Sequence, residues 1–167
     1  MRPPSTASRH LVIHPGSGGV AKCWPPDRFA ALIARLAPQS GPCPQGPDSP
    51  PGPTRQRRTT LVGEAEVDRW PRATLDALHA TPVLDLPTLH ATLATATAFL
   101  GNDSGPTHLA AAMGVPTVAL FGPSDPLQWS PLGARVTVLA PPSPRPMDWL
   151  DIDAVAPAVR GVLDLPS

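Results

Sequence analysis

One short polar loop carries the residue types with the clearest chemistry in this sequence. The segment FLGNDSGPTHLAAAMG predicts a buried strand end at Ala98–Leu100, a loop over Gly101–Gly105 and a helix that runs to Met113. A loop that leads from a parallel strand into a helix attracts anions, because its backbone N–H groups and the positive end of the helix dipole meet there. The order of these elements therefore predicts a site for phosphate groups.

The side chains of this loop fit the same interpretation. Ser104 and Thr107 offer hydroxyl donors, and His108 offers a ring nitrogen in the first turn of the helix. The plainer alternative is that Asn102, Asp103 and Ser104 are only turn and N-cap residues, which are the types preferred at such places. A second small-residue loop, FGPSDP, follows the next predicted strand at Thr117–Phe121 and favours a binding edge over an isolated turn.

A glycine-rich loop nearer the N-terminus offers a second anion contact. The segment PGSGGVAK lies between a predicted strand at Leu11–His14 and a predicted helix at Pro25–Leu36. Because Ala21 precedes Lys22 and Cys23 follows it, this segment is not a P-loop, which needs glycine before the lysine and serine or threonine after it. Lys22 remains a point charge that can contact a phosphate; the alternative is an ordinary surface lysine.

Two carboxylates follow the strand predicted at Thr59–Val62. Glu64 and Glu66 stand where an acidic residue can accept hydrogen bonds from ribose hydroxyls. The alternative is that both are exposed carboxylates in the first turn of a helix, where the dipole favours them. The sequence does not decide between Glu64 and Glu66.

The elements that carry these loops alternate between strand and helix. Further segments predict a loop at Gly63–Glu66 that leads into a helix ending near His79, and a strand at Pro82–Leu84. They also predict a helix at Pro87–Thr95, a strand at Val136–Leu139 and a closing helix at Ile152–Leu163. Short loops between alternating strands and helices predict an α/β fold, a Rossmann-like parallel sheet with helices on both faces. The loops described above would then share one edge of that sheet.

Several segments resemble glycosyltransferase family 9, the ADP-heptose:lipopolysaccharide heptosyltransferases and their relatives. The similarity rests on GNDSGPTHLAAAMGVPTVALFGPSDPLQWSPLG, on LVIHPGSGGVAKCWPPDRFAALIARL, and on TTLVGEAEVDRW and TPVLDLPTLHATLATATAFLGND between them. It covers about residues 11 to 140 and implies the C-terminal, donor-binding half of a GT-B enzyme. The implied function is to bind a nucleotide-diphospho-sugar, such as ADP-heptose, for transfer to a lipopolysaccharide-type or other glycan acceptor.

The resemblance also implies a set of donor-binding residues. In the family, the hydroxyl residue and the lysine of the first loop contact the phosphates, and an acidic residue after the next strand holds the ribose. Asp103 would hold its own loop or meet a hydroxyl of the donor sugar, since phosphates would repel it. The positions carried over are Ser17, Lys22, Glu66, Asp103, Ser104, Gly105, Thr107 and His108.

The catalytic base has no candidate in this sequence. The resemblance places it, with the glycan or lipid-linked acceptor, on an N-terminal half that we do not find before Leu11, so we expect an enzyme that is incomplete as this chain alone. Two alternatives remain open. One is a sugar-nucleotide-binding module or truncated gene product without catalysis, and the other is half of a GT-B-type nucleotide-sugar epimerase, against which the HPGSG and GNDSGPTHLA pair argues.

Composition narrows the class of partner. The 167 residues carry a formal net charge of zero, which does not favour nucleic acid. The two cysteines show no zinc-ligand spacing, no cofactor is expected, and no apolar run reaches the length of a membrane span. We expect one domain over 11–165, with a flexible tail at 1–10 and a proline-rich disordered insertion at 38–58, in the cytoplasm or at the inner face of the membrane.

Overall fold

The computed structural model describes residues 9–36, 56–83 and 85–165. The strands are β1 (Arg9–His14), β2 (Gln56–Val62), β3 (Ala80–Pro82), β4 (Ala98–Asn102), β5 (Thr117–Leu120) and β6 (Val136–Leu139). The helices are η1 (Val20–Lys22), α1 (Pro26–Arg35), α2 (Glu64–Arg69), α3 (Arg72–Ala77), α4 (Leu86–Leu93), α5 (Gly105–Ala112), α6 (Pro126–Trp129), η2 (Met147–Trp149) and α7 (Ile152–Leu163).

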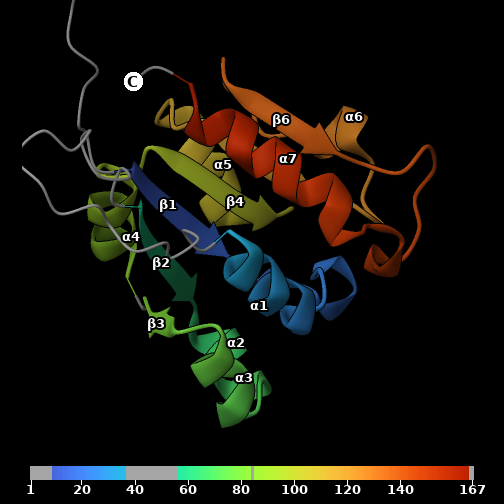
Figure 1. Cartoon of the computed structure of the whole chain (residues 1–167). Coiled ribbons are helices and arrows are strands. Elements are labelled where there is room, and N and C mark those ends of the chain that lie inside the picture. The colour runs from blue at the N-terminus through green and yellow to red at the C-terminus, as the bar shows by residue number, and fades with distance from the viewer. Residues whose placement is uncertain (1–8, 37–55, 84, 166–167) are drawn as a thin grey trace, which may run out of the picture.

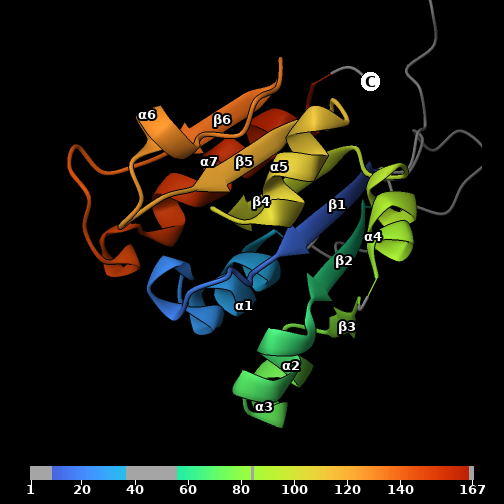
Figure 2. The ribbon, with the colours of Figure 1, turned by 180° about the vertical axis from the view of Figure 1, so that it is seen from behind.

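The strands form one parallel sheet in the order β3-β2-β1-β4-β5-β6. β1 lies in the middle, where its residues pair with β2 on one side and β4 on the other (Figures 1 and 2). Both central strands are almost fully buried, as the continuous apolar runs LVI and AFL require. The expected Rossmann-like α/β sheet is confirmed.

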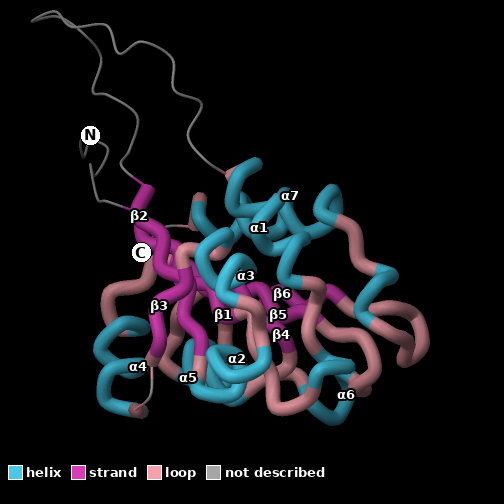
Figure 3. The backbone as a smooth tube through the Cα atoms, turned by 90° about the horizontal axis from the view of Figure 1, so that it is seen from below, coloured by secondary structure: helices cyan, strands magenta, loops and turns pink. Residues whose placement is uncertain are grey.

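Helices cover both faces of the sheet, and the side chains of β1 show how. Leu11 and Ile13 belong to a core that α1 and α7 complete, whereas Val12 belongs to a second core with α4 and α5. This alternation follows from the two-residue period of a strand. Figure 3 shows α1 and α7 on one side of the strands and α4 and α5 on the other.

The order in which strands are added to the sheet changes direction between the neighbouring strands β1 and β4. From β1 it adds β2 and β3 toward one edge, and from β4 it adds β5 and β6 toward the other. The loops that leave the carboxyl ends of β1 and β4 therefore diverge and leave a crevice, which is where open α/β sheets bind ligands.

The predicted starts of two strands were wrong. β1 begins at Arg9, within the expected tail at 1–10, and not at Leu11. β2 begins at Gln56, because Gln56, Arg57 and Arg58 pair with Arg9, His10 and Leu11 of β1. These polar residues suit a strand because they lie at its less buried end, and the guanidinium of Arg58 donates to the carbonyl oxygen of Ile33 at the end of α1. The remainder of the expected tail and insertion, at residues 1–8 and 38–55, lies outside the described residues.

The segment after β2 also differs from expectation. The single helix predicted up to His79 is divided into α2 and α3 at Trp70 and Pro71. Proline disfavours the helical region for the residue before it, and Trp70 is accordingly extended at φ −93° and ψ 140°. β3 is Ala80–Pro82, in place of the expected strand at Pro82–Leu84.

Candidate functional site

Two loops meet at the crevice between β1 and β4. One runs from Pro15 to Trp24 after β1, and the other covers Asp103 and Ser104 between β4 and α5. A cavity of about 460 Å³ opens between them, within the size range of small-molecule sites. It is lined by Ser17, Gly18, Gly19, Lys22, Asp103, Ser104, Gly105, His108 and Trp129.

Six of the eight predicted site residues line this one cavity. They are Ser17, Lys22, Asp103, Ser104, Gly105 and His108, which come from two segments about 80 positions apart in the chain. The other two, Glu66 and Thr107, are buried beside it and do not line it.

Asn102 ties the two loops together. This fully buried side chain donates from Nδ2 to the carbonyl oxygen of Pro15 at 2.7 Å and accepts at Oδ1 from the backbone N–H of Trp24 at 3.0 Å. Trp24 is itself fully buried, donates from Nε1 to the carbonyl oxygen of Leu150 and meets the ring of Phe29 edge-on. Asn102 therefore holds the start and the end of the first loop against β4, a role that sequence reasoning missed.

Lys22 and Asp103 form an ion pair across the cavity. The Nζ of Lys22 lies 2.8 Å from Oδ2 of Asp103, whose side chain is only 6% exposed. The Nε2 of His108 lies 3.7 Å from the other carboxylate oxygen. Since a lysine ammonium carries three protons, this contact leaves two of them for another acceptor. The pair compensates the charge of Asp103 and aims the ammonium group of Lys22 at the loop.

The hydroxyl groups of the predicted site mainly support the loops. Ser17 donates to the carbonyl oxygen of Asp103 at 2.8 Å, and Thr107 donates to the carbonyl oxygen of Asn102 at 2.6 Å. Because the proton of Thr107 is used in this way, its oxygen can only accept from Ser104, 3.1 Å away. Thr107 is thus a positioning residue beneath the loop, while Ser104 remains partly exposed at the cavity.

The start of α5 is open toward the cavity. Ser104 is the N-cap residue by position, but its side chain makes no capping hydrogen bond. Within the described part of the chain, the backbone N–H groups of Ser104 and Gly105 have no hydrogen-bond partner, whereas Pro106 has no N–H and Thr107 N–H bonds to Ser104 O. A Cβ atom at Gly105 would meet nothing within 4 Å. The first turn of α5 therefore offers two backbone donors and free space to an anion.

These contacts weigh against the plainer interpretation of the loop. Asn102 reaches across to the first loop, Asp103 reaches Lys22, and Ser104 leaves the helix uncapped by its side chain. The side chains of these three polar residues therefore do more than stabilise a turn or cap a helix: those of Asn102 and Asp103 contact the loop after β1, and that of Ser104 leaves the start of α5 uncapped.

The carboxylate of Glu66 has a structural role at the start of α2. It is 4% exposed, and its Oε2 accepts from the backbone N–H of Gly63, the N-cap residue of α2, at 3.0 Å, which is the one half of a capping box that a glycine N-cap allows. A Cβ atom on Gly16 would lie 2.3 Å from Cδ of Glu66, so the first loop rests directly on this carboxyl group. Glu64, two residues earlier, is exposed.

His14, at the end of β1, is a buried residue that sequence reasoning missed. Its Nδ1 lies 3.4 Å from Oγ of Ser104. Burial lowers the pKa of this ring from its ordinary 6.5, while the charge of Glu66 and a hydrogen bond to Gly16 oppose that change. The ring is therefore neutral near pH 7 and contributes no charge beneath the loop.

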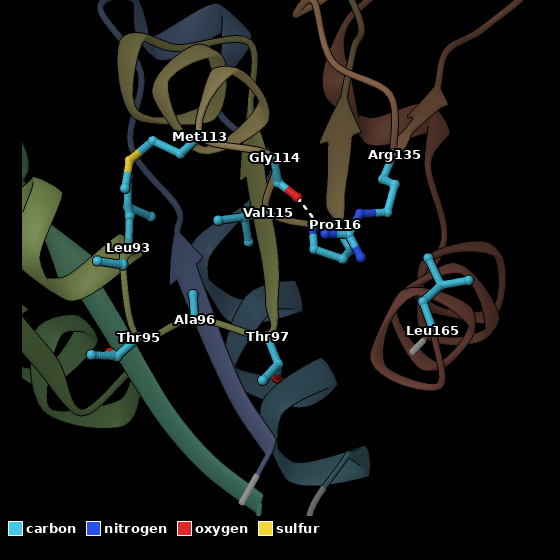
Figure 4. Close-up of a pocket in the computed structure, with 11 residues that line it drawn as sticks. Leu93, Thr95, Ala96, Thr97, Met113, Gly114, Val115, Pro116, Arg135 and Leu165 are labelled. Atoms are coloured by element: carbon cyan, nitrogen blue, oxygen red, sulfur yellow. Dashed lines mark hydrogen bonds between the residues drawn. The ribbon is translucent and has the colours of Figure 1, made fainter. Parts of the chain in front are cut away.

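A second hollow, of about 340 Å³, lies at the opposite, amino edge of the sheet. Figure 4 shows its lining around the turns that enter β4 and β5, including Thr95, Ala96, Gly114 and Val115. The guanidinium of Arg135 donates there to the carbonyl oxygen of Gly114 at 2.9 Å. No predicted site residue lies at this hollow.

Comparison with known proteins gives the family. The model of glycosyltransferase family 9 (heptosyltransferase) matches residues 3–147 of this chain. The chain belongs to glycosyltransferase family 9. This membership confirms the resemblance seen in the sequence and argues against the epimerase alternative.

Individual relatives agree with the family. Lipopolysaccharide heptosyltransferase 3 of Escherichia coli is 30% identical over 122 residues, which are 73% of this chain and 34% of the relative. The structure of E. coli heptosyltransferase WaaC with ADP matches at a TM-score of 0.70 and 21% identity, over 95% of this chain and 46% of WaaC. WaaC with ADP-2-deoxy-2-fluoro heptose matches at a TM-score of 0.66 and 21% identity, over 95% and 44%.

These shares show how much of a relative the chain represents. It spans about a third of the curated heptosyltransferases it matches and just under half of the solved ones. Its fold is that of one Rossmann-like half of a GT-B glycosyltransferase. Across residues 9–36, 56–83 and 85–165, no helix is long and apolar enough to cross a membrane.

Proposed function

We propose that this chain binds the nucleotide-diphospho-sugar donor of a heptosyltransferase-type reaction. The observation that carries the proposal is the Lys22–Asp103 ion pair. It places the ammonium group of Lys22 in the cavity between β1 and β4, beside the start of α5, which no side chain caps. Family membership supports a sugar nucleotide over other anions.

The diphosphate would rest on the start of α5. The backbone N–H groups of Ser104 and Gly105, the dipole of α5 and the two remaining protons of Lys22 all point to this place. The ion pair with Lys22 would offset the negative charge of Asp103 beside the phosphates. Ser17, Asn102 and Thr107 would act indirectly, by holding both loops at the right separation.

The nucleoside would extend from the diphosphate toward β2, where a carboxylate can accept from the ribose hydroxyls. Glu64 is exposed there, while Glu66 would need to exchange its bond from Gly63 for one from the ribose. Because WaaC has been solved with ADP and with ADP-2-deoxy-2-fluoro heptose, we take ADP-heptose as the first donor to test.

In the reaction, these groups would stabilise the diphosphate as it leaves. Negative charge grows on the leaving group in the transition state, and the preorganised donors and Lys22 would lower its energy. Another GT-B half would provide the general base and bind the glycan acceptor. Val20 and Leu127 are large, exposed apolar residues on η1 and α6, the elements that bring Lys22 and Trp129 to the cavity, and they favour such a covering partner.

A thermal-shift panel tests the proposal most directly. ADP, UDP, GDP and their sugar conjugates are each added to the chain, and we expect ADP and ADP-heptose to raise Tm, because ligands that bind only the folded state stabilise it. Inorganic phosphate and adenosine are the controls. A panel in which no nucleotide raises Tm would overturn the proposal. A second experiment adds the N-terminal half of a family 9 enzyme: sugar transfer to an acceptor would identify an enzyme, and its absence a module that only binds.

A further inference from the structure

Trp129 is an aromatic side chain in the cavity that the predicted site did not include. It ends α6, which Asp125 caps by accepting from the N–H of Leu127 at 2.9 Å, and the residue is 49% exposed. The other tryptophans serve packing: Trp24 is fully buried, and Trp70 and Trp149 pack against the main core. Trp129 lines the cavity and belongs to neither of the two cores.

The indole of Trp129 faces Lys22. The Nζ of Lys22 lies 5.8 Å from the ring centroid, within the range of a cation–π contact. The ammonium group is therefore placed between the carboxylate of Asp103 and the aromatic face. This contact orients the ring toward the place where the diphosphate would lie.

The order of the strands separates the two ends of a bound donor. Lys22 and Gly105 belong to the loops after β1 and β4, in the middle of the sheet. Glu64 and Glu66 follow β2 on one side of this centre, and Trp129 follows β5 on the other. A nucleotide sugar that places its diphosphate in the middle and its ribose beside β2 must direct its sugar toward β5 and α6.

We propose that Trp129 forms the sugar subsite, with its indole packed against the apolar face of the donor's transferred sugar. The proposal rests on the proposed function and adds the contact that selects a sugar-bearing nucleotide over the bare diphosphate. An exposed indole gains by covering C–H groups of a ring, because both surfaces leave water. The hydroxyl groups of the same sugar would lie within reach of Asp103 and His108, which line the same cavity.

Calorimetry with ADP and ADP-heptose on Trp129→Ala tests this subsite. We expect the wild-type chain to bind ADP-heptose more tightly than ADP, and the substitution to remove about tenfold from the affinity for ADP-heptose while the affinity for ADP changes less than twofold. Trp129→Phe should retain most of the preference and Trp129→Leu should lose it. Leu127→Ala is the matched control, because Leu127 is on the same helix, 96% exposed and absent from the cavity lining.

The other outcomes are distinct. An equal loss for ADP and ADP-heptose would show that the ring holds the base or only orients Lys22, and would overturn the sugar subsite. Unchanged affinity for both would make Trp129 a simple surface residue and also overturn it. Failure of both nucleotides to bind the wild-type chain would overturn the proposed function itself, and the subsite with it.

Discussion

Among the described residues, a hollow lies at each of the two edges of this sheet, and the two hollows differ in the chemistry of their linings. At the carboxyl edge, about 460 Å³ are lined by Lys22, Asp103, His108 and an uncapped helix start. At the amino edge, about 340 Å³ are lined mainly by small and apolar side chains. The α4 and α5 helices end there, and Gly114 presents its carbonyl oxygen, which Arg135 already uses (Figure 4).

The difference in lining follows from the direction of the strands. In a parallel α/β sheet every helix that covers a face begins at the carboxyl edge and ends at the amino edge. Positive helix ends and free N–H groups therefore gather at one edge, and negative ends and carbonyl groups gather at the other. An anionic ligand such as a diphosphate is attracted only to the first.

Among the substitutions at the carboxyl edge, Gly105→Val should have the largest effect on ADP binding. The side chain would occupy the space over the helix start that the phosphate needs, so we expect ADP binding to fall beyond detection by calorimetry while Tm changes little, because nothing lies within 4 Å of a Cβ there. Ala94→Val, at the amino-edge hollow, is the control and should bind normally. Normal binding by Gly105→Val would mean that the anion does not lie on α5.

Asn102→Ala should act through the scaffold of the carboxyl edge. It leaves the buried carbonyl of Pro15 and the buried N–H of Trp24 without their partner, at a cost of about 2–4 kcal/mol in the free energy of unfolding. Urea denaturation measures the loss, and ADP affinity should fall as well. A stable variant with unchanged affinity would show that the two loops are held by other contacts.

Lys22→Ala should weaken ADP binding without unfolding the chain. A charge-assisted contact to phosphate contributes roughly 1.5–3 kcal/mol, which corresponds to about ten- to a hundredfold in affinity. Arg72→Ala removes a positive charge from exposed α3, outside the cavity, and serves as the control. Equal affinity in the Lys22 variant would identify this lysine as an ordinary surface charge.

Ser104→Ala should have a smaller effect. If backbone N–H groups and the helix dipole provide most of the hold, the lost hydroxyl costs only about 0.5–1.5 kcal/mol of binding free energy, the net contribution of one hydrogen bond. Calorimetry compares this variant with Gly105→Val. A reversed order of the two effects would move the anion away from the start of α5.

Acidification should produce the smallest effect, a decrease in the free energy of unfolding to which one histidine near each edge of the sheet contributes. His10 and His14 stand at opposite ends of β1, and burial lowers the pKa of each ring from its ordinary 6.5. Below pH 6.5 the unfolded chain therefore binds more protons than the folded chain, and the free energy of unfolding falls until the lowered native pKa is reached. Urea denaturation between pH 8 and 5 should show this fall, and His14→Gln and His10→Gln should each reduce it; a pH-independent stability would contradict it.

The sequence allowed the strands and the convergence of the two loops to be predicted, because apolar runs and glycine-rich turns are local signals. Ser104 and Gly105 follow from the predicted order of strand, loop and helix, whereas Lys22 was preferred over an ordinary surface lysine only through the resemblance to glycosyltransferase family 9. The contributions of Asn102, His14 and Trp129 depend on pairing between segments far apart in the chain, which periodicity does not reveal. Arg57 and Arg58 were missed as strand residues because their polarity suits a loop, although they occupy the less buried end of β2.

The hydrogen bonds from Asn102 to Pro15 and from Ser17 to Asp103 join residues 87 and 86 positions apart. The cavity therefore does not exist until β4 has docked beside β1, a non-local event that comes with a large loop-closure entropy. A folding intermediate that contains only β1, β2 and β3 would hold half of the anion site and bind no nucleotide. Added ADP should then leave the refolding rate nearly unchanged and lower the rate of global unfolding, so this ligand would stabilise the native state kinetically.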